Sequence, residues 1–240
     1  MSDLVLLFER LAQQALGPLL IALVASAAIV SLIRNWRVSL PALIIQSVVV
    51  GVLLARVIQP SVALVKPLAG IIACVTLSIA AQRADNARAA HGEQTAEERI
   101  EHVNWRSVPS QVLLRAIAVL IVLVGAFGAT VRFPLPGNAR ELALGAYILL
   151  ACGLFVVATS PEGLNIGTGL LMMISGVEIG YIPLEPSISV SILLGLMTLI
   201  VTIAIAYLTL ADGDALTETL QLAPALALVG DDDEEEDRFA

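Results

Sequence analysis

The sequence predicts an all-α protein, a polytopic transmembrane bundle of about seven helices that ends in a disordered acidic C-terminal tail. Composition is the first observation behind this prediction. Hydrophobic residues make up 58% of the 240 residues and charged residues only 14%, whereas soluble domains carry ~25% charged residues. The second observation is that the apolar residues are gathered in charge-poor runs, and a helix needs about 20 such residues to cross a bilayer. We therefore expect the lipid bilayer to be the solvent of most of the chain.

Each apolar run is hydrophobic on all sides. Strands of membrane barrels instead alternate in polarity over ~10 residues. The first run follows more acidic than basic residues, which is not typical of a cleaved signal, so we expect it to be a retained helix. The seven expected spans cover residues 11–33, 38–55, 61–82, 111–131, 142–159, 163–182 and 187–211.

The spans divide the chain into four expected parts. Residues 1–82 form an N-terminal three-helix membrane segment and 83–110 a polar cytoplasmic loop. Residues 111–211 form a four-helix membrane segment, and 212–240 form an exposed acidic tail. Most of the formal net charge of −8 comes from the acidic run at 231–237, and such runs are usually solvated and disordered.

Arginines are concentrated in the loops that lie on the same side as the C-terminus. Because basic loops stay in the cytoplasm, we expect a multi-pass protein of the cell (inner) membrane with its N-terminus outside and its C-terminus cytoplasmic. The chain has no basic face for nucleic acid. Its two histidines lack the spacing of a metal site, and ligand patterns for iron–sulfur clusters, haem or flavin are missing. We expect no cofactor, no metal and no catalytic residue in this chain.

Two ionisable residues, Lys66 and Glu178, fall well inside expected spans. Charges within a bilayer are costly, so they usually face the protein interior and often mark ion pathways. Both residues lie four or five positions from the same expected membrane face, roughly 6–8 Å deep at 1.5 Å per residue. They can form a pair or two stations of one ion path. The alternative is that Lys66 extends to the interface while Glu178 is protonated or locally hydrogen-bonded.

Glycines surround Glu178 at a spacing that permits close helix packing. Gly176 and Gly180 form one G-x-x-x-G spacing, and Gly163 and Gly167 form another. Small residues four positions apart let a second backbone approach closely. We expect these four glycines to be helix-packing residues, and a carboxylate on such a seam would be shielded from lipid.

The segment G-L-L-M-M-I-S-G-V-E-I-G at 169–180, followed after a break by S-I-L-L-G-L-M-T-L-I-V at 191–201, resembles the K subunit of respiratory complex I. It also resembles the E component of formate hydrogenlyase-type membrane hydrogenases, and Gln46 and the Lys66–Pro67 pair fit the earlier part of that component. Gly176 and Glu178 match the K-subunit motif. At the place of its second carboxylate this chain has Ser191, which leaves Glu185 in the preceding turn as the other acidic candidate.

The resemblance implies a non-redox membrane subunit of an energy-converting complex, which couples electron transfer elsewhere to proton or sodium movement. Its implied ion-path candidates are Glu178, Lys66, Glu185 and Ser191, and its implied partners are other membrane subunits of a larger complex. Two alternatives remain open. The chain can be a structural or assembly subunit of another large membrane complex, or a stand-alone transporter, although it shows none of the inverted repeats common in carriers.

Overall fold

The computed structural model describes residues 16–33, 35–90, 109–133, 140–185 and 187–230. Within these ranges the chain forms helices and no strands, so the all-α prediction is confirmed. The helices are α2 (Leu16–Leu32), α3 (Trp36–Leu54), α4 (Pro60–Ala63), α5 (Val65–Ala90), α7 (Pro109–Arg132), α8 (Arg140–Thr159), α9 (Gly163–Tyr181) and α10 (Ile188–Gly230).

Six of the described helices, α3, α5, α7, α8, α9 and α10, are long and apolar enough to cross a membrane. The apolar part of α2, Gly17–Leu32, is shorter. The first expected span began five residues before α2, and residues 11–15 lie outside the described part of the chain. A multi-pass membrane bundle is therefore the architecture of the described residues.

Local chemistry explains where two of these helices begin. Asn35 precedes α3, and its side-chain oxygen accepts a hydrogen bond from Arg37 N at 3.0 Å, as favoured N-cap residues do. The third expected span is divided at Leu64 into α4 and α5. Pro67 has no backbone N–H and cannot donate to the carbonyl of Ala63, which weakens the helix at this division.

Two helices continue beyond their expected membrane spans, although the apolar, membrane-length part of α10 ends at Ala211 as expected. The third span was expected to end at 82 and to be followed by a loop, but α5 continues to Ala90. Residues 83–90 contain no glycine or proline and half of them are alanine, the best helix former. The last span was expected to end at 211 before a disordered tail, but α10 continues to Gly230 through a segment rich in alanine and leucine. The acidic run at 231–237 lies outside the described residues.

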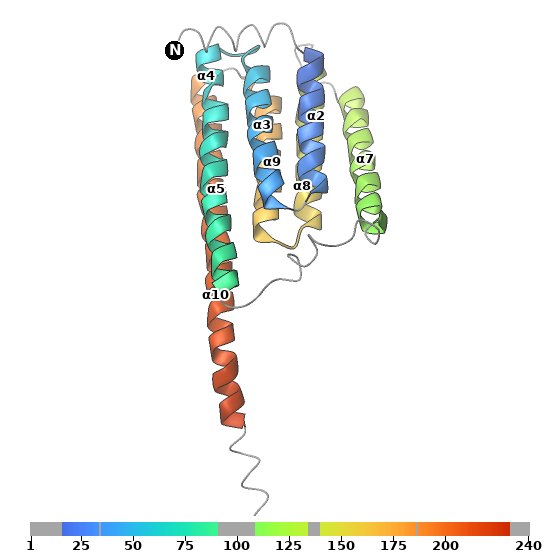
Figure 1. The fold of residues 1–240 in the computed structure, drawn as a ribbon. Helices are drawn as coiled ribbons and strands as arrows, with labels where there is room; N and C mark the ends of the chain where they lie inside the picture. The colour runs from blue at the N-terminus through green and yellow to red at the C-terminus, as the bar shows by residue number, and fades with distance from the viewer. Residues whose placement is uncertain (1–15, 34, 91–108, 134–139, 186, 231–240) are drawn as a thin grey trace, which may run out of the picture.

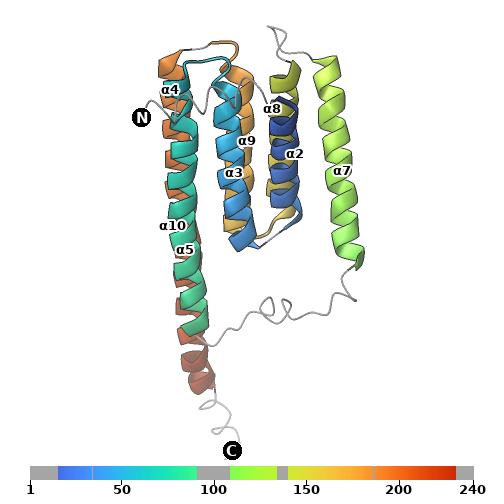
Figure 2. The ribbon, with the colours of Figure 1, turned by 45° about the horizontal axis from the view of Figure 1, so that its top comes forward.

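The helices stand side by side in two layers (Figures 1 and 2). One layer runs α5, α3, α2 and the other α10, α9, α8, and neighbours pack within and between the layers. Helix α7 packs at the edge against α8 and α2. Helix α2 begins at one end of the bundle and α10 leaves at the opposite end (Figure 1). We call the end where α3 ends and α5 begins the α3–α5 turn end.

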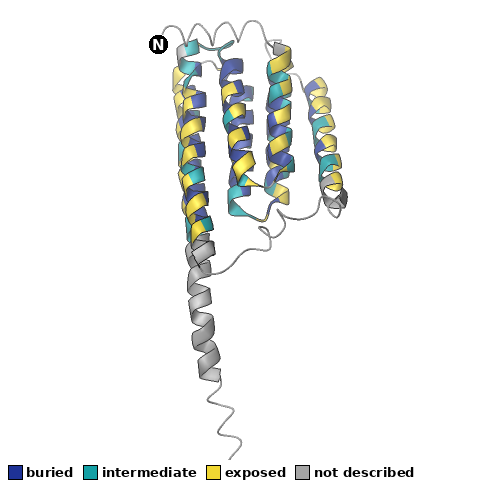
Figure 3. Ribbon diagram, in the orientation of Figure 1, coloured by how far each residue is buried: buried dark blue, intermediate teal, exposed yellow. Residues whose placement is uncertain are grey.

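Exposed residues lie on the outside of every long helix (Figure 3), and many of them are large apolar residues. The most exposed spans are α7, of whose apolar window 17% is buried, and α10, with 28%. Such outward apolar faces are expected of helices in contact with lipid, where no hydrophobic force drives helices together. Exposed large residues of α7 include Leu113, Leu114, Ile117, Leu120, Ile121, Val124 and Phe127.

Candidate ion-pair site

Lys66 and Glu178 form an ion pair inside the bundle. Lys66 lies in the first turn of α5 and Glu178 in the last turn of α9, so both come from the α3–α5 turn end. Lys66 is 4% exposed and Glu178 3% exposed. The alternative in which Lys66 extends to the interface is therefore wrong, because the ammonium group turns inward to the carboxylate.

A close contact between α3 and α5 positions the lysine. A Cβ atom on Gly51 would lie 2.7 Å from Cδ of Pro67 and 3.3 Å from the carbonyl oxygen of Ala63. Real Cβ atoms do not approach other atoms so closely, so only glycine lets α3 pack here. Lys66 is adjacent to Pro67, and the tight contact holds the start of α5 against α3. The sequence signal for this arrangement is the Lys66–Pro67 pair together with Gly51.

A small cavity adjoins the ion pair. It is lined by residues of α3, α4, α5, α9 and α10 and the turns beside them, including Lys66, Glu178, Ser191 and Gly195. Its volume, measured as space for the centre of a water molecule, is about 10 Å³. One water molecule needs ≳10–15 Å³ on this measure, so the cavity is close to the size of a single water.

Among the described residues, the two atoms that form the ion pair contact only each other as polar partners. Lys66 Nζ and Glu178 Oε2 have no hydrogen-bond partner among the described residues apart from each other. An ammonium group has three N–H donors, so this one is undersupplied with acceptors. Removing charges from water costs several kcal/mol per ion. Each of the two charges at this site is therefore compensated mainly by the other.

Of the other two expected ion-path residues, one lies beside the ion pair and the other lies on the surface. Ser191 in α10 is 6% exposed and lines the cavity. Its hydroxyl donates to the carbonyl of Ser187 at 3.4 Å. Glu185 is exposed and accepts a hydrogen bond from the Tyr181 hydroxyl at 3.3 Å. Glu185 therefore belongs to the surface turn and does not join Glu178.

The glycines of α9 pack on helices other than the one that supplies Lys66. A Cβ on Gly176 would lie 2.9 Å from Ala146 O and Leu150 N of α8, and one on Gly167 would lie 2.4 Å from the Ile205 side chain of α10. A Cβ on Gly180 would have its nearest contact at 3.6 Å, an ordinary distance.

The sequence had suggested that Glu178 and Gly176 lie on one packing seam. The structure shows that they do not. Two residues along a helix differ in direction by about 200°, so Gly176 faces α8 while Glu178 faces α5. Helices α8 and α9 also approach closely at Gly153 and Gly169. A Cβ on Gly153 would lie 2.7 Å from the carbonyl oxygen of Gly169, and a Cβ on Gly169 would lie 2.9 Å from that of Gly153. Gly163 is at the start of α9.

Gln46 is a buried polar residue that was not among the expected ion-path residues. It lies in α3, is 1% exposed, and neither atom of its amide has a hydrogen-bond partner among the described residues. It precedes Gly51 by five residues, which places it about 8 Å deeper in the bundle than the level of Lys66. A neutral amide within an otherwise apolar span is the sequence signal that would have identified it.

Many of the interior hydroxyl groups form hydrogen bonds within their own helices, although those of Ser39 and Ser160 have no partner among the described residues. Thr202 donates to the carbonyl of Thr198 at 2.7 Å, Thr198 to that of Leu194 at 2.9 Å, and Ser175 to that of Leu171 at 3.0 Å. Serine and threonine commonly satisfy themselves in this way in helices. They line the interior from α9 and α10 without bridging the helices.

Within the described ranges, no three His, Cys, Asp or Glu side chains are grouped as a metal site would require. The histidines considered from the sequence, His91 and His102, lie outside those ranges. Cys74 and Cys152 are both buried and unpaired. Comparisons of the chain with protein-family models, with curated proteins and with solved structures give no match.

Proposed function

We propose that this chain is a non-redox integral membrane subunit of an energy-converting complex, of the complex I or membrane hydrogenase kind, and that protons or sodium ions pass through Lys66 and Glu178. The observation that carries the proposal is the buried ion pair itself. Ionisable groups inside a membrane bundle are costly, and they usually mark ion pathways.

The pairing supports ion transfer because it couples the two charge states. A proton that reaches Glu178 neutralises the carboxylate and leaves the Lys66 ammonium without its counter-charge. The lysine then favours releasing its own proton to another acceptor, since an unpaired buried charge is strongly destabilising. Uptake at one residue thus promotes release at the other. A sodium ion would act by competing with the ammonium group for the carboxylate.

Two further groups extend the proposed path from the pair. Ser191 lines the same cavity, which is close to the size of one water molecule and has room for one beside the ion pair. Gln46 lies deeper, toward the middle of the bundle, with an amide that can both donate and accept hydrogen bonds. In this chain Ser191 stands where the complex I-like pattern has a second carboxylate, so the path has one buried acid.

We further propose that the α3–α5 turn end faces the outside of the cell (inner) membrane and that the opposite end, where α10 leaves, is cytoplasmic. The described arginines divide almost evenly between the two ends of the bundle, and the bias comes from the loop arginines of the whole sequence, which are more numerous on the side of the α10 exit end. Loop arginines favour the cytoplasmic side. In this orientation the buried ion pair lies nearer to the outer face than to the cytoplasmic face. The exposed faces of α7 and α10 are available to lipid and to partner subunits.

The test is to purify the intact complex by a tag on this chain in mild detergent and to reconstitute it in vesicles. Partner identification defines the electron donor, and ion uptake is then measured during electron transfer. Glu178→Gln should abolish uptake while electron transfer continues. Glu185→Gln is the matched control, because it makes the same change at an exposed carboxylate, and it should behave like the wild type.

Three outcomes would contradict the proposal. Normal ion uptake by an assembled Glu178→Gln complex would exclude the path. Partners that copurify without showing any effect of Glu178 or Lys66 would identify a structural or assembly subunit. Substrate-dependent flux in vesicles that contain this chain alone would identify a stand-alone transporter.

A further inference from the structure

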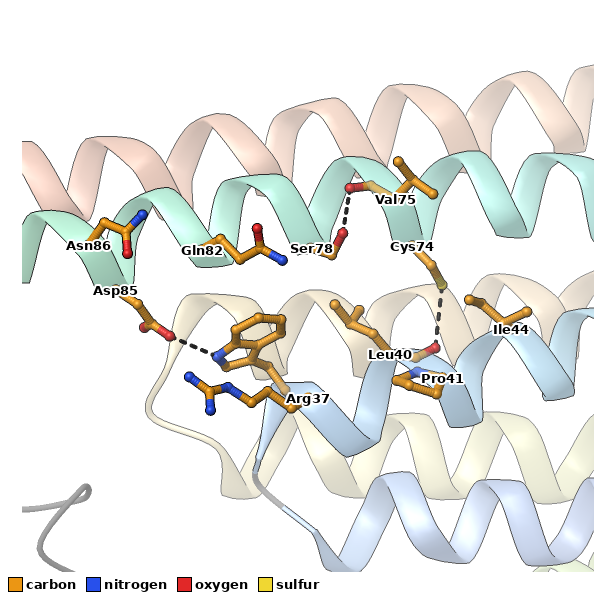
Figure 4. A pocket seen from close by; sticks show the side chains of 11 residues that line it. Arg37, Leu40, Pro41, Ile44, Cys74, Val75, Ser78, Gln82, Asp85 and Asn86 are labelled. Atoms are coloured by element: carbon orange, nitrogen blue, oxygen red, sulfur yellow. Dashed lines mark hydrogen bonds between the residues drawn. The ribbon is translucent and has the colours of Figure 1, made fainter. Parts of the chain in front are cut away.

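A second cavity, separate from the ion pair, lies between the first half of α3 and residues 74–86 of α5 (Figure 4). Its volume is about 550 Å³, within the range of ~300–1,000 Å³ that small-molecule sites occupy. Pro41 of α3 and Val75 of α5 line it and are exposed, so the cavity is a groove on the outside of the bundle. We call it the α3–α5 groove.

The α3–α5 groove is polar at one end and apolar at the other. Arg37, Asp85 and Asn86 lie at the end near the start of α3, whereas Ile44 and Cys74 lie at the deep end (Figure 4). From Asn86 to Cys74 the groove follows α5 for twelve residues, about 18 Å of helix. Half of the hydrocarbon core of a bilayer is about 15 Å thick. The groove therefore spans about one leaflet.

The polar end has charges of both signs in fixed positions. The Trp36 indole N–H donates to Asp85 Oδ2 at 3.1 Å and connects the two helices. The guanidinium of Arg37 lies 5.6 Å from the centre of the Trp36 ring. A guanidinium binds phosphate through two parallel hydrogen bonds. Asp85 uses one acceptor position for the indole, and a carboxylate has about four such positions, so it can also accept from an ammonium group.

We propose that the α3–α5 groove binds a glycerophospholipid whose headgroup carries a phosphate and an ammonium, as in phosphatidylethanolamine. The phosphate contacts Arg37 and the ammonium contacts Asp85, while one acyl chain lies along Pro41, Ile44 and Val75. Trp36 suits this level, because tryptophan is enriched where the headgroups meet the hydrocarbon. A purely anionic lipid fits less well, because Asp85 repels it.

The test uses the purified full-length chain in detergent, with phosphatidylethanolamine or phosphatidylglycerol added at equal concentrations. Native mass spectrometry counts the lipids retained. Val75→Trp fills the groove, and Ile79→Trp is its matched control, since Ile79 is equally exposed one turn along α5 but does not line the groove. Arg37→Gln removes the phosphate contact. Arg83→Gln removes an exposed charge of α5 that does not line the groove.

Wild type, Ile79→Trp and Arg83→Gln should retain one phosphatidylethanolamine. Val75→Trp and Arg37→Gln should bind it at least about tenfold more weakly. For Arg37→Gln this factor corresponds to the loss of one charge-assisted hydrogen bond. Unchanged retention in both variants would overturn the groove as a site. Equal retention of phosphatidylglycerol and phosphatidylethanolamine would overturn the headgroup assignment. Because Arg37 is exposed, its variant tests the proposal even where Val75→Trp does not fold.

Discussion

Neutralising one member of the buried ion pair should destabilise the bundle far more than neutralising both. Glu178→Leu leaves the Lys66 ammonium buried at 4% exposure without a counter-charge, and Lys66→Met leaves the carboxylate in the same position. Breaking a buried pair from one side typically costs about 3–5 kcal/mol, whereas replacing both partners by apolar residues is often neutral or stabilising. Each single variant should therefore raise the equilibrium constant for unfolding by roughly 10²-fold to several 10³-fold. The double variant should unfold like the wild type.

Equilibrium unfolding in mixed micelles of detergent and SDS measures these free energies, and the four proteins form a double-mutant cycle. Glu185→Gln, at an exposed position, should change the unfolding free energy by no more than about 0.5 kcal/mol. The charge-swapped variant, Lys66→Glu with Glu178→Lys, should regain most of the stability lost by the single variants. Additive losses in the double variant would refute the reasoning, because they would mean that the two side chains do not compensate each other.

Further predictions concern packing, the interior amide and the single lysine. Gly176→Ala should destabilise by about 1–3 kcal/mol, because overpacking shifts backbone and its Cβ would meet backbone atoms of α8 at 2.9 Å. Gly128→Ala has open space around it and should be neutral or stabilising by up to about 1 kcal/mol in the same unfolding assay. Gln46→Leu should keep or raise stability, because an unpaired buried amide costs ~1–3 kcal/mol, yet it should slow ion uptake in vesicles. Lys66, the only lysine, should resist an amine-reactive reagent until SDS unfolds the chain, as mass spectrometry would show.

Most of the fold follows from hydrophobic run length. The apolar spans locate α3, α8 and α9 to within two residues of their observed ends, because the end of a membrane span coincides with a change from apolar to polar residues. Helix ends and expected span ends differ where a helix leaves the apolar region. Helices α5 and α10 continue into polar sequence, since alanine and leucine propagate a helix whether or not lipid surrounds it. The length of an apolar run predicts the part of a helix that lies in the bilayer, whereas helix propensity predicts where the helix ends.

The candidate site was only partly predictable. The sequence placed Lys66 and Glu178 at the same level, because each lies four or five positions from the same expected membrane face. Depth carries no information on which faces of two helices meet, so the pairing itself depends on how α3 and α10 pack against both α5 and α9. The same limit explains Gly176, which was expected to shield Glu178 but points to α8. Rotation about a helix axis is set by neighbouring helices, and a single apolar sequence constrains it weakly.

The ion pair is difficult to explain as a device for stability. Apolar residues of similar volume would hold α5 and α9 together equally well or better, and α9 already packs closely on α8 through Gly153, Gly169 and Gly176. A role in fixing the register of the helices is the strongest competing explanation, because buried polar pairs can specify one arrangement. The charge-swapped variant separates the two explanations. It keeps an opposite pair in place and so keeps the register, but it moves the acid from α9 to α5. Normal ion uptake by that variant would favour register, and loss of uptake from a stable bundle would favour the ion path.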